Sequence, residues 1–226
     1  MAWRYAHQCV IMRDDRVFSE TRWLAILIVP FLVVAFVILY LNTSETKARF
    51  AWEIKAPMSA MMLGSAYIGG AYFFGRAALV SRWHRIGLGF LPITVFASFM
   101  AVATLIHWDV FSHGKAAFYV WTALYFATPF VVLAAWWRNR LTDPGMPEEQ
   151  DYLLPDVIRY AVAAAGLANL VICAGLFVRP GEMIDIWPWA LTPLTARVGA
   201  AMFALQGVFA VGLAADPRWS SARITL

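Results

Sequence analysis

The stretch WLAILIVPFLVVAFVILYL, residues 23–41, decides the fold, because it carries no charged side chain and is long enough to cross a membrane as a helix. The hydrocarbon core of a bilayer is about 30 Å thick, which takes about 20 helical residues. Similar apolar runs follow at about 58–80, 86–108, 117–137, 156–178 and 197–215. Because lipid offers the backbone no hydrogen-bond partner, each run should be helical. We therefore expect an all-α integral membrane bundle of six transmembrane helices.

The composition agrees with this interpretation. The chain is 62% hydrophobic and only 14% charged, so it carries more apolar surface than one soluble domain could bury. Its net charge of +4 is dispersed rather than gathered in a stripe, which argues against a nucleic-acid partner. Cys9 and Cys173 stand in different environments and should not pair. The expected partner is the lipid bilayer.

The distribution of basic residues predicts the orientation. Arginines gather at the N-terminus, after every even-numbered run and at the C-terminus, whereas fewer Lys and Arg fall on the other side, a ratio of about two to one. This bias predicts a plasma-membrane protein with both termini in the cytoplasm, and either Met1 or Met12 as the start. The expected parts are a cytoplasmic tail, the six-helix domain and a second cytoplasmic tail, at 1–22, 23–215 and 216–226.

The connections between the runs are short. Residues 81–85 and 108–116 leave no room for a folded domain, so consecutive helices should be antiparallel neighbours. The longest loop on the predicted cytoplasmic side, 138–155, is rich in Pro, Gly and acids and is typical of a solvated turn.

Three segments resemble one another. FAWEIKAPMSAMMLGSAY from Phe50, IHWDVFSHGKAAFYVWTALY from Ile106 and IDIWPWALTPLTARVGAAMF from Ile184 each lead into an even-numbered helix. The similarity predicts an internal repeat of three tandem helical hairpins. The alternative is that any helix that begins at the outer interface shows Trp, then Pro or Ser/Thr, then small residues.

Two of these motifs also resemble known sequences. The run WPWALTPLTAR, Trp187–Arg197, and the segment from Phe50 are similar to motifs of multi-pass bacterial membrane proteins. The resemblance covers about a quarter of the chain. It implies the same helical architecture and attaches no activity to it.

Acids, histidines and a tryptophan of the predicted outer loops are candidate ligand-binding residues: Glu53, His107, Asp109, His113, Asp185 and Trp187. If the hairpins close into one bundle, their oxygen and imidazole donors would suit a divalent metal or a cationic ligand. The competing interpretation is a set of solvated charges beside a tryptophan belt, which the absence of an H-E-x-x-H spacing favours. His107 and His113 flank one short loop, which does not suit haem. We predict no metal and no cofactor.

Polar and small residues within the apolar runs predict how the helices pack. Asn169 and Gln206 are costly in lipid, so they should face the interior and hydrogen-bond across helices, or contact a ligand there. Ala60 and Gly64 should let a neighbouring backbone approach closely, from this chain or from a second copy.

Prolines inside the helices predict a cavity. Pro30, Pro92 and Pro129 each remove a backbone hydrogen bond and favour a kink. A pocket between the third and fourth helices could admit a lipid or another apolar ligand, although core packing explains the same aromatic residues: Phe96, Phe99, Tyr119, Trp121 and Tyr125.

No catalytic residue can be assigned, since phosphate loops, G-x-S-x-G, dinucleotide fingerprints and paired intramembrane carboxylates are missing from the sequence. The leading hypothesis is a non-enzymatic protein, either an accessory subunit of a membrane partner or homo-oligomer, or a binder of a small apolar or membrane-derived ligand. The alternatives are a small transporter or permease, and a metal-dependent enzyme at the outer rim.

Overall fold

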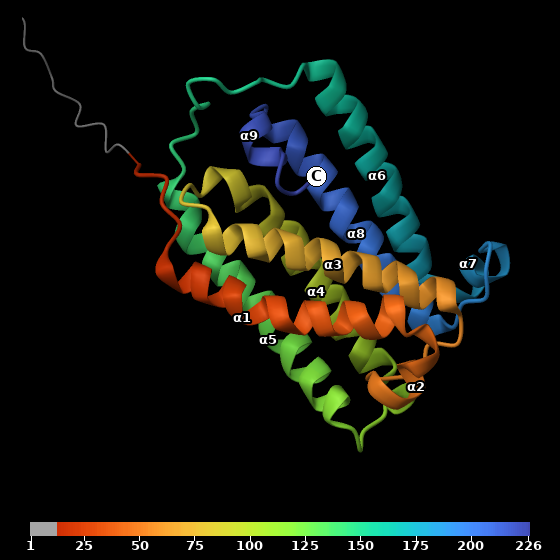
Figure 1. The fold of residues 1–226 in the computed structure, drawn as a ribbon. Coiled ribbons are helices and arrows are strands. Elements are labelled where there is room, and N and C mark those ends of the chain that lie inside the picture. Colours follow the sequence, from red (N-terminus) through yellow and green to blue (C-terminus); the bar gives the residue numbers. More distant parts are fainter. Residues whose placement is uncertain (1–12) are drawn as a thin grey trace, which may run out of the picture.

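The computed structural model describes residues 13–226, and within that range it consists of helices and connecting turns (Figure 1). Arg4, His7 and Cys9 of the expected tail lie outside the described residues. The six apolar runs are all helical, as predicted. The long helices are α1 Ser19–Phe36, α3 Pro57–Leu79, α4 His84–Ile106, α5 Ala116–Asn139, α6 Asp156–Val178 and α8 Pro193–Ala215. The shorter elements are η1 Val37–Leu41, η2 Thr43–Glu45, α2 Thr46–Arg49, η3 Trp108–Val110, η4 Arg140–Thr142, α7 Pro180–Ile186 and α9 Trp219–Ala222.

Five helices in the described part of the chain are long and apolar enough to span a membrane: α1 with η1, α4, α5 with η4, α6 and α8. The helix α3 is as long as α4 but is not among them. Its glycines, its tyrosines and Arg76 make it less hydrophobic than its neighbours. The prediction of an all-helical chain is confirmed for the described residues, which include five candidate membrane-spanning helices. A sixth span stays a prediction.

The helices pair mainly as α1 with α3, α4 with α5, and α6 with α8, and the contact between α4 and α8 joins the last pair to the others. The prediction that consecutive helices are neighbours holds within each pair. It is wrong for α3 and α4, whose backbones approach closely at few positions, and for α5 and α6, which do not pack against each other. Aromatic side chains fill the space between them. The rings of Phe73 and Phe74 lie 5.7 and 6.3 Å from the ring of Phe90.

Glycines mark the closest helix contacts. A Cβ added at Gly64 would lie 2.9 Å from the Cβ of Tyr40, so the predicted close approach at Gly64 occurs within the chain, against the end of η1. At Gly166 an added Cβ would lie 2.7 Å from the Cβ of Ala210, and at Gly207 it would lie 2.7 Å from the side chain of Leu170. These contacts require glycine, because real Cβ atoms do not approach one another so closely.

The bundle has two ends of different character (Figure 1). We call the end with α2, α7 and residues 107–115 the α2 end. The opposite end carries residues 13–18, residues 143–155 and α9, and we call it the α9 end. Residues 143–155 contain no helix, as expected of a turn, but side-chain contacts described below hold them in place.

Candidate ligand-binding groove

A cavity of about 460 Å³ lies between α1, α3, α4 and α5, and we call it the groove. This volume lies within the range of about 300–1,000 Å³ that is typical of small-molecule sites. Its lining is almost entirely apolar and comprises Ile28, Pro30, Phe31, Leu32, Val34, Ala35, Ile38, Arg49, Phe50, Tyr67, Phe74, Ile93, Phe96, Ala97, Ala116, Ala117, Val120, Trp121, Leu124, Tyr125 and Thr128.

The groove extends from the α2 end to about the middle of the bundle. On α5 its lining begins at Ala116, the first residue of the helix, and ends at Thr128. At 1.5 Å per residue this corresponds to about 18 Å. Several lining side chains, such as Phe31, Val34 and Val120, are also exposed on the surface of the bundle. The groove therefore reaches the surface that would face lipid.

Aromatic side chains form the wall on α4 and α5. The ring centroids of Trp121 and Tyr125 lie 4.3 Å apart, and that of Phe96 lies 6.2 Å from Tyr125. The sequence-predicted pocket is confirmed for these three residues and wrong for two others. Phe99 packs against Phe177 with ring centroids 4.7 Å apart, and Tyr119 is exposed, so neither lines the groove.

Two buried tyrosines supply the polar group in the groove. Tyr67 on α3 and Tyr125 on α5 both line it, and their hydroxyl oxygens lie 2.7 Å apart. One hydroxyl donates to the other, which uses one of the two hydrogens. The second hydroxyl hydrogen has no acceptor among the described residues, so the pair can donate one hydrogen bond to a bound molecule.

The mouth of the groove at the α2 end is basic. Arg49 lines it and forms an ion pair with Glu45, with Nε 3.3 Å from the carboxylate. Lys115 directly precedes the lining residue Ala116, and its ammonium group donates to the backbone carbonyl of Lys47. Two cations, Arg49 and Lys115, thus lie at the start of the apolar lining, with the carboxylate of Glu45 beside Arg49.

The sequence-predicted rim residues do not gather. Glu53, Asp109 and Asp185 are exposed and form no ion pair within the described range. His113 Nε2 lies 3.0 Å from the carbonyl oxygen of Trp108. The chain over 13–226 holds no group of three or more His, Cys, Asp or Glu side chains that could bind a metal. The convergence that a rim metal site requires is not formed.

His107 has a different partner. Its Nε2 accepts a hydrogen bond of 2.6 Å from Arg197 Nη1. Burial, and then the charge of Arg197, hold the pKa of His107 below its ordinary value, so the ring is neutral at pH 7 and able to accept. Trp187 packs against Trp189 and Phe203, with ring centroids 5.3 and 6.0 Å away. His107 thus hydrogen-bonds Arg197, whereas Trp187 has a packing role.

The two amides of the apolar runs, Asn169 and Gln206, also differ from expectation. Gln206 is exposed on α8, so the prediction that it faces the interior is wrong. The inner faces of α8 carry small residues such as Ala204 and Gly207, which allow neighbouring helices to approach. Asn169 on α6 is partly buried, and neither amide forms a hydrogen bond within the described residues.

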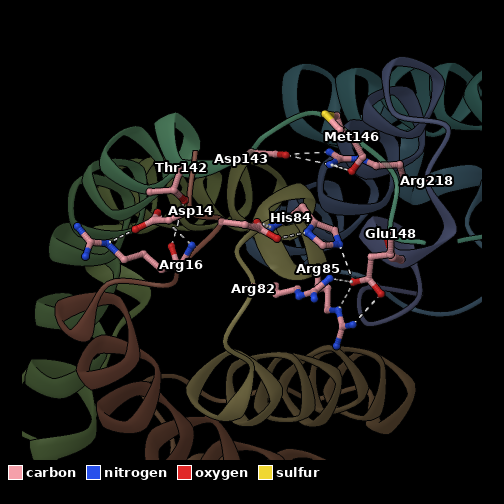
Figure 2. A network of polar contacts seen from close by, with 12 residues as sticks. Asp14, Arg16, Arg82, His84, Arg85, Thr142, Asp143, Met146, Glu148 and Arg218 are labelled. Carbon is pink, nitrogen blue, oxygen red and sulfur yellow. Dashed lines mark hydrogen bonds and ion pairs between the residues drawn. The ribbon is translucent and has the colours of Figure 1, made fainter. Parts of the chain in front are cut away.

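A polar cluster at the α9 end is the feature that sequence reasoning missed. Figure 2 shows His84, at the start of α4, with Glu148 on one side and residues near the N-terminus on the other. His84 Nδ1 lies 2.5 Å from Asp15 Oδ2. His84 Nε2 lies 2.9 Å from Glu148 Oε1, but the geometry of this contact does not meet that of a hydrogen bond. Arg85 donates to both oxygens of Glu148 at 2.5 and 2.7 Å.

Arg218 forms the second half of this cluster. Its guanidinium group donates to both carboxylate oxygens of Asp143 at 2.9 Å (Figure 2). It also donates to both carboxylate oxygens of Asp216, at 2.9 and 2.7 Å. Ser220 on α9 hydrogen-bonds Asp151, whose Oδ1 lies 2.9 Å from the backbone N. Asp143 and Glu148 are thus paired with arginines of other segments, and Asp151 accepts hydrogen bonds from Ser220, so the cluster tethers the loop rather than offering an open site. The sequence signal for this cluster is an acid-rich loop, residues 143–151, in a chain whose arginines gather at the same end of the bundle.

The groove was therefore partly foreseen through Trp121 and Tyr125, whereas Tyr67 and Arg49 could be found only once the helices were paired. No protein-family model matches this chain, and neither a curated protein nor a solved structure matches it.

Proposed function

We propose that this protein is a non-enzymatic membrane protein that binds an apolar, membrane-derived ligand in the groove. The observation that carries the proposal is the 460 Å³ apolar cavity with a hydroxyl donor in its wall. Protein interiors pack at a density that leaves few voids larger than a water molecule. A space of this size, lined by Phe31, Phe96 and Trp121, suits a hydrocarbon chain.

The polar groups of the groove are consistent with binding rather than catalysis. The lining contains no carboxylate, histidine, cysteine or lysine. The Tyr67–Tyr125 pair offers one hydrogen bond, and an acceptor on the ligand at that depth would complete it. General acid–base catalysis needs a group that exchanges protons near neutral pH, and a phenol does so poorly.

The proposal includes an orientation. We place all six long helices across the plasma membrane as three tandem hairpins, with the α9 end in the cytoplasm. Arginines of the α9 end, such as Arg82, Arg138 and Arg223, support this choice, because positive charge favours the cytoplasmic side. The groove then opens toward the outer half of the bilayer.

The test compares two alanine-to-phenylalanine variants on one helix. Ala117 lines the groove, whereas Ala123 is exposed on the same helix and does not. Protein purified in a mild non-ionic detergent is extracted with organic solvent, and the bound lipids are quantified by mass spectrometry. We expect about one retained molecule per chain for wild type and Ala123→Phe, and a clear loss for Ala117→Phe. Equal retention by the two variants would refute the proposal.

A further inference from the structure

The mouth of the groove carries an unusual combination of charge and exposure. Arg49 is the charged residue in an otherwise apolar lining, and its side chain is 65% exposed. Lys115 lies one residue before the lining begins on α5, and its ammonium group is tied to the carbonyl of Lys47 on α2. Arg49 on α2 therefore lines the opening, and Lys115 directly precedes the first lining residue of α5.

The ion pair at the mouth is weak enough to be exchanged. Arg49 and Glu45 are both largely exposed, with side chains 65% and 45% accessible. Exposed pairs of this kind contribute little to stability. A guanidinium group matches a carboxylate or phosphate through two parallel hydrogen bonds, so Arg49 could turn from Glu45 to an anionic headgroup at little cost.

The shape of the groove fixes how such a ligand would lie. The cationic opening leads into a channel about 18 Å long, from Ala116 to Thr128, with no further charged side chain in its lining. A charge is costly in that apolar interior, so the headgroup must stay at the opening. The cavity volume suits one hydrocarbon chain better than the two chains of a diacyl lipid.

We infer that the groove selects an anionic amphiphile with a single apolar chain, whose headgroup binds at Arg49 and Lys115 and whose chain lies along Trp121 and Tyr125. This inference rests on the proposed function and adds the charge of the ligand. A fatty carboxylate and a single-chain phosphate ester share this chemistry.

The experiment uses three probes with the same chain: oleate, oleoyl lysophosphatidate and uncharged oleyl alcohol. Binding to the full chain is measured at pH 8 by native mass spectrometry in a neutral detergent. We expect wild type to bind the anionic probes roughly tenfold more tightly than the alcohol, because charge-assisted hydrogen bonds are about twice as strong as neutral ones. Higher salt should weaken only the anionic probes. The ratio between oleate and the lysophosphatidate identifies the preferred headgroup.

Variants of opposite expected sign test the role of Arg49. Arg49→Gln should reduce the preference to about one, whereas Glu45→Gln should increase it, because Glu45 competes for the same guanidinium group. Lys55→Gln removes an exposed cation that does not line the groove and is the matched control. Arg49 is exposed, so thermal stability should be unchanged.

Two outcomes separate the inference from the proposed function. Equal binding of oleate and oleyl alcohol by wild type, with both lost in Ala117→Phe, would overturn the charge selection and keep the apolar site. An unchanged preference in Arg49→Gln would also overturn it. Failure of wild type to bind any of the three probes would overturn both.

Discussion

Replacing Asn139 by alanine should destabilise the α9 end of the bundle. Asn139 is fully buried, and its Nδ2 donates to Thr21 Oγ1 at 2.6 Å and to the carbonyl of Ala135 at 2.7 Å. Its Oδ1 accepts from the backbone N–H of Phe18 at 2.9 Å. In Asn139→Ala, the Phe18 N–H and the Thr21 hydroxyl lose this partner. An unsatisfied buried group costs about 1–3 kcal/mol, so we expect a loss of about 2–4 kcal/mol.

The assay is thermal unfolding in a neutral detergent. For a chain of this size, about 1 kcal/mol changes Tm by about 2–4 °C, which predicts a decrease of about 5–15 °C. Asn42→Ala is the control, because the Nδ2 of Asn42 donates only to the carbonyl of Val37, at an exposed site. Its Tm should decrease by no more than about 3 °C. Equal decreases in the two variants would refute the reasoning, since burial would then have no influence on the cost.

Three further predictions concern other parts of the bundle. Hydrogen bonds from Arg85 lower the pKa of Glu148 from 4.5 to about 2. The contribution of Glu148 to stability is therefore complete above pH 4.5 and is lost as the pH falls toward 2. Glu148→Gln should flatten the decrease of Tm across that pH range. Tyr125→Phe should reduce the free energy of unfolding by about 1–3 kcal/mol, because the buried Tyr67 hydroxyl loses its partner. The double variant Tyr67→Phe/Tyr125→Phe should return to within about 1 kcal/mol of wild type in the same assay. Gly207→Leu should cost about 3 kcal/mol or prevent folding, because α6 leaves no room for a side chain, and Gly69→Leu, which has open space, should have the Tm of wild type.

The long helices could be predicted from the sequence because the apolar length needed to cross lipid is a local property. The predicted run 156–178 coincides with α6, and 58–80 differs from α3 by one residue at each end. Which helices touch could not be read in the same way. The separation of α3 and α4 depends on where Phe73 and Phe90 point once the bundle has closed.

The candidate sites show the same limit. Trp121 and Tyr125 could be placed beside a pocket because they repeat along one predicted helix. Arg49 lies on a four-residue helix that no periodicity indicates. His84 has little meaning alone in a turn, since its partners Asp15 and Glu148 are 69 and 64 residues away (84 − 15 and 148 − 84). Interactions between distant segments determine both sites.

The groove is best explained as the gap between two hairpins that are fastened to each other at both ends. At the α9 end, Asn139 of the α4–α5 hairpin hydrogen-bonds Thr21 of the α1–α3 hairpin. At the α2 end, Trp52 packs against Trp121 with ring centroids 4.8 Å apart, and Ser112 N–H donates to the carbonyl of Ala51 at 2.9 Å.

Between these two fastenings, a single side-chain hydrogen bond, from one tyrosine hydroxyl to the other, crosses from hairpin to hairpin in the described residues. Aromatic rings also pack between α3 and α4 in the half of the bundle nearer the α9 end. A cavity held open by fixed contacts at both ends needs no rearrangement before it binds a ligand, which reduces the cost of binding. Stability and ligand binding should therefore respond to different substitutions. Asn139→Ala should weaken the contact at the α9 end and lower Tm, but the folded variant should retain lipid as wild type does. Ala117→Phe, within the groove, should lose the lipid instead.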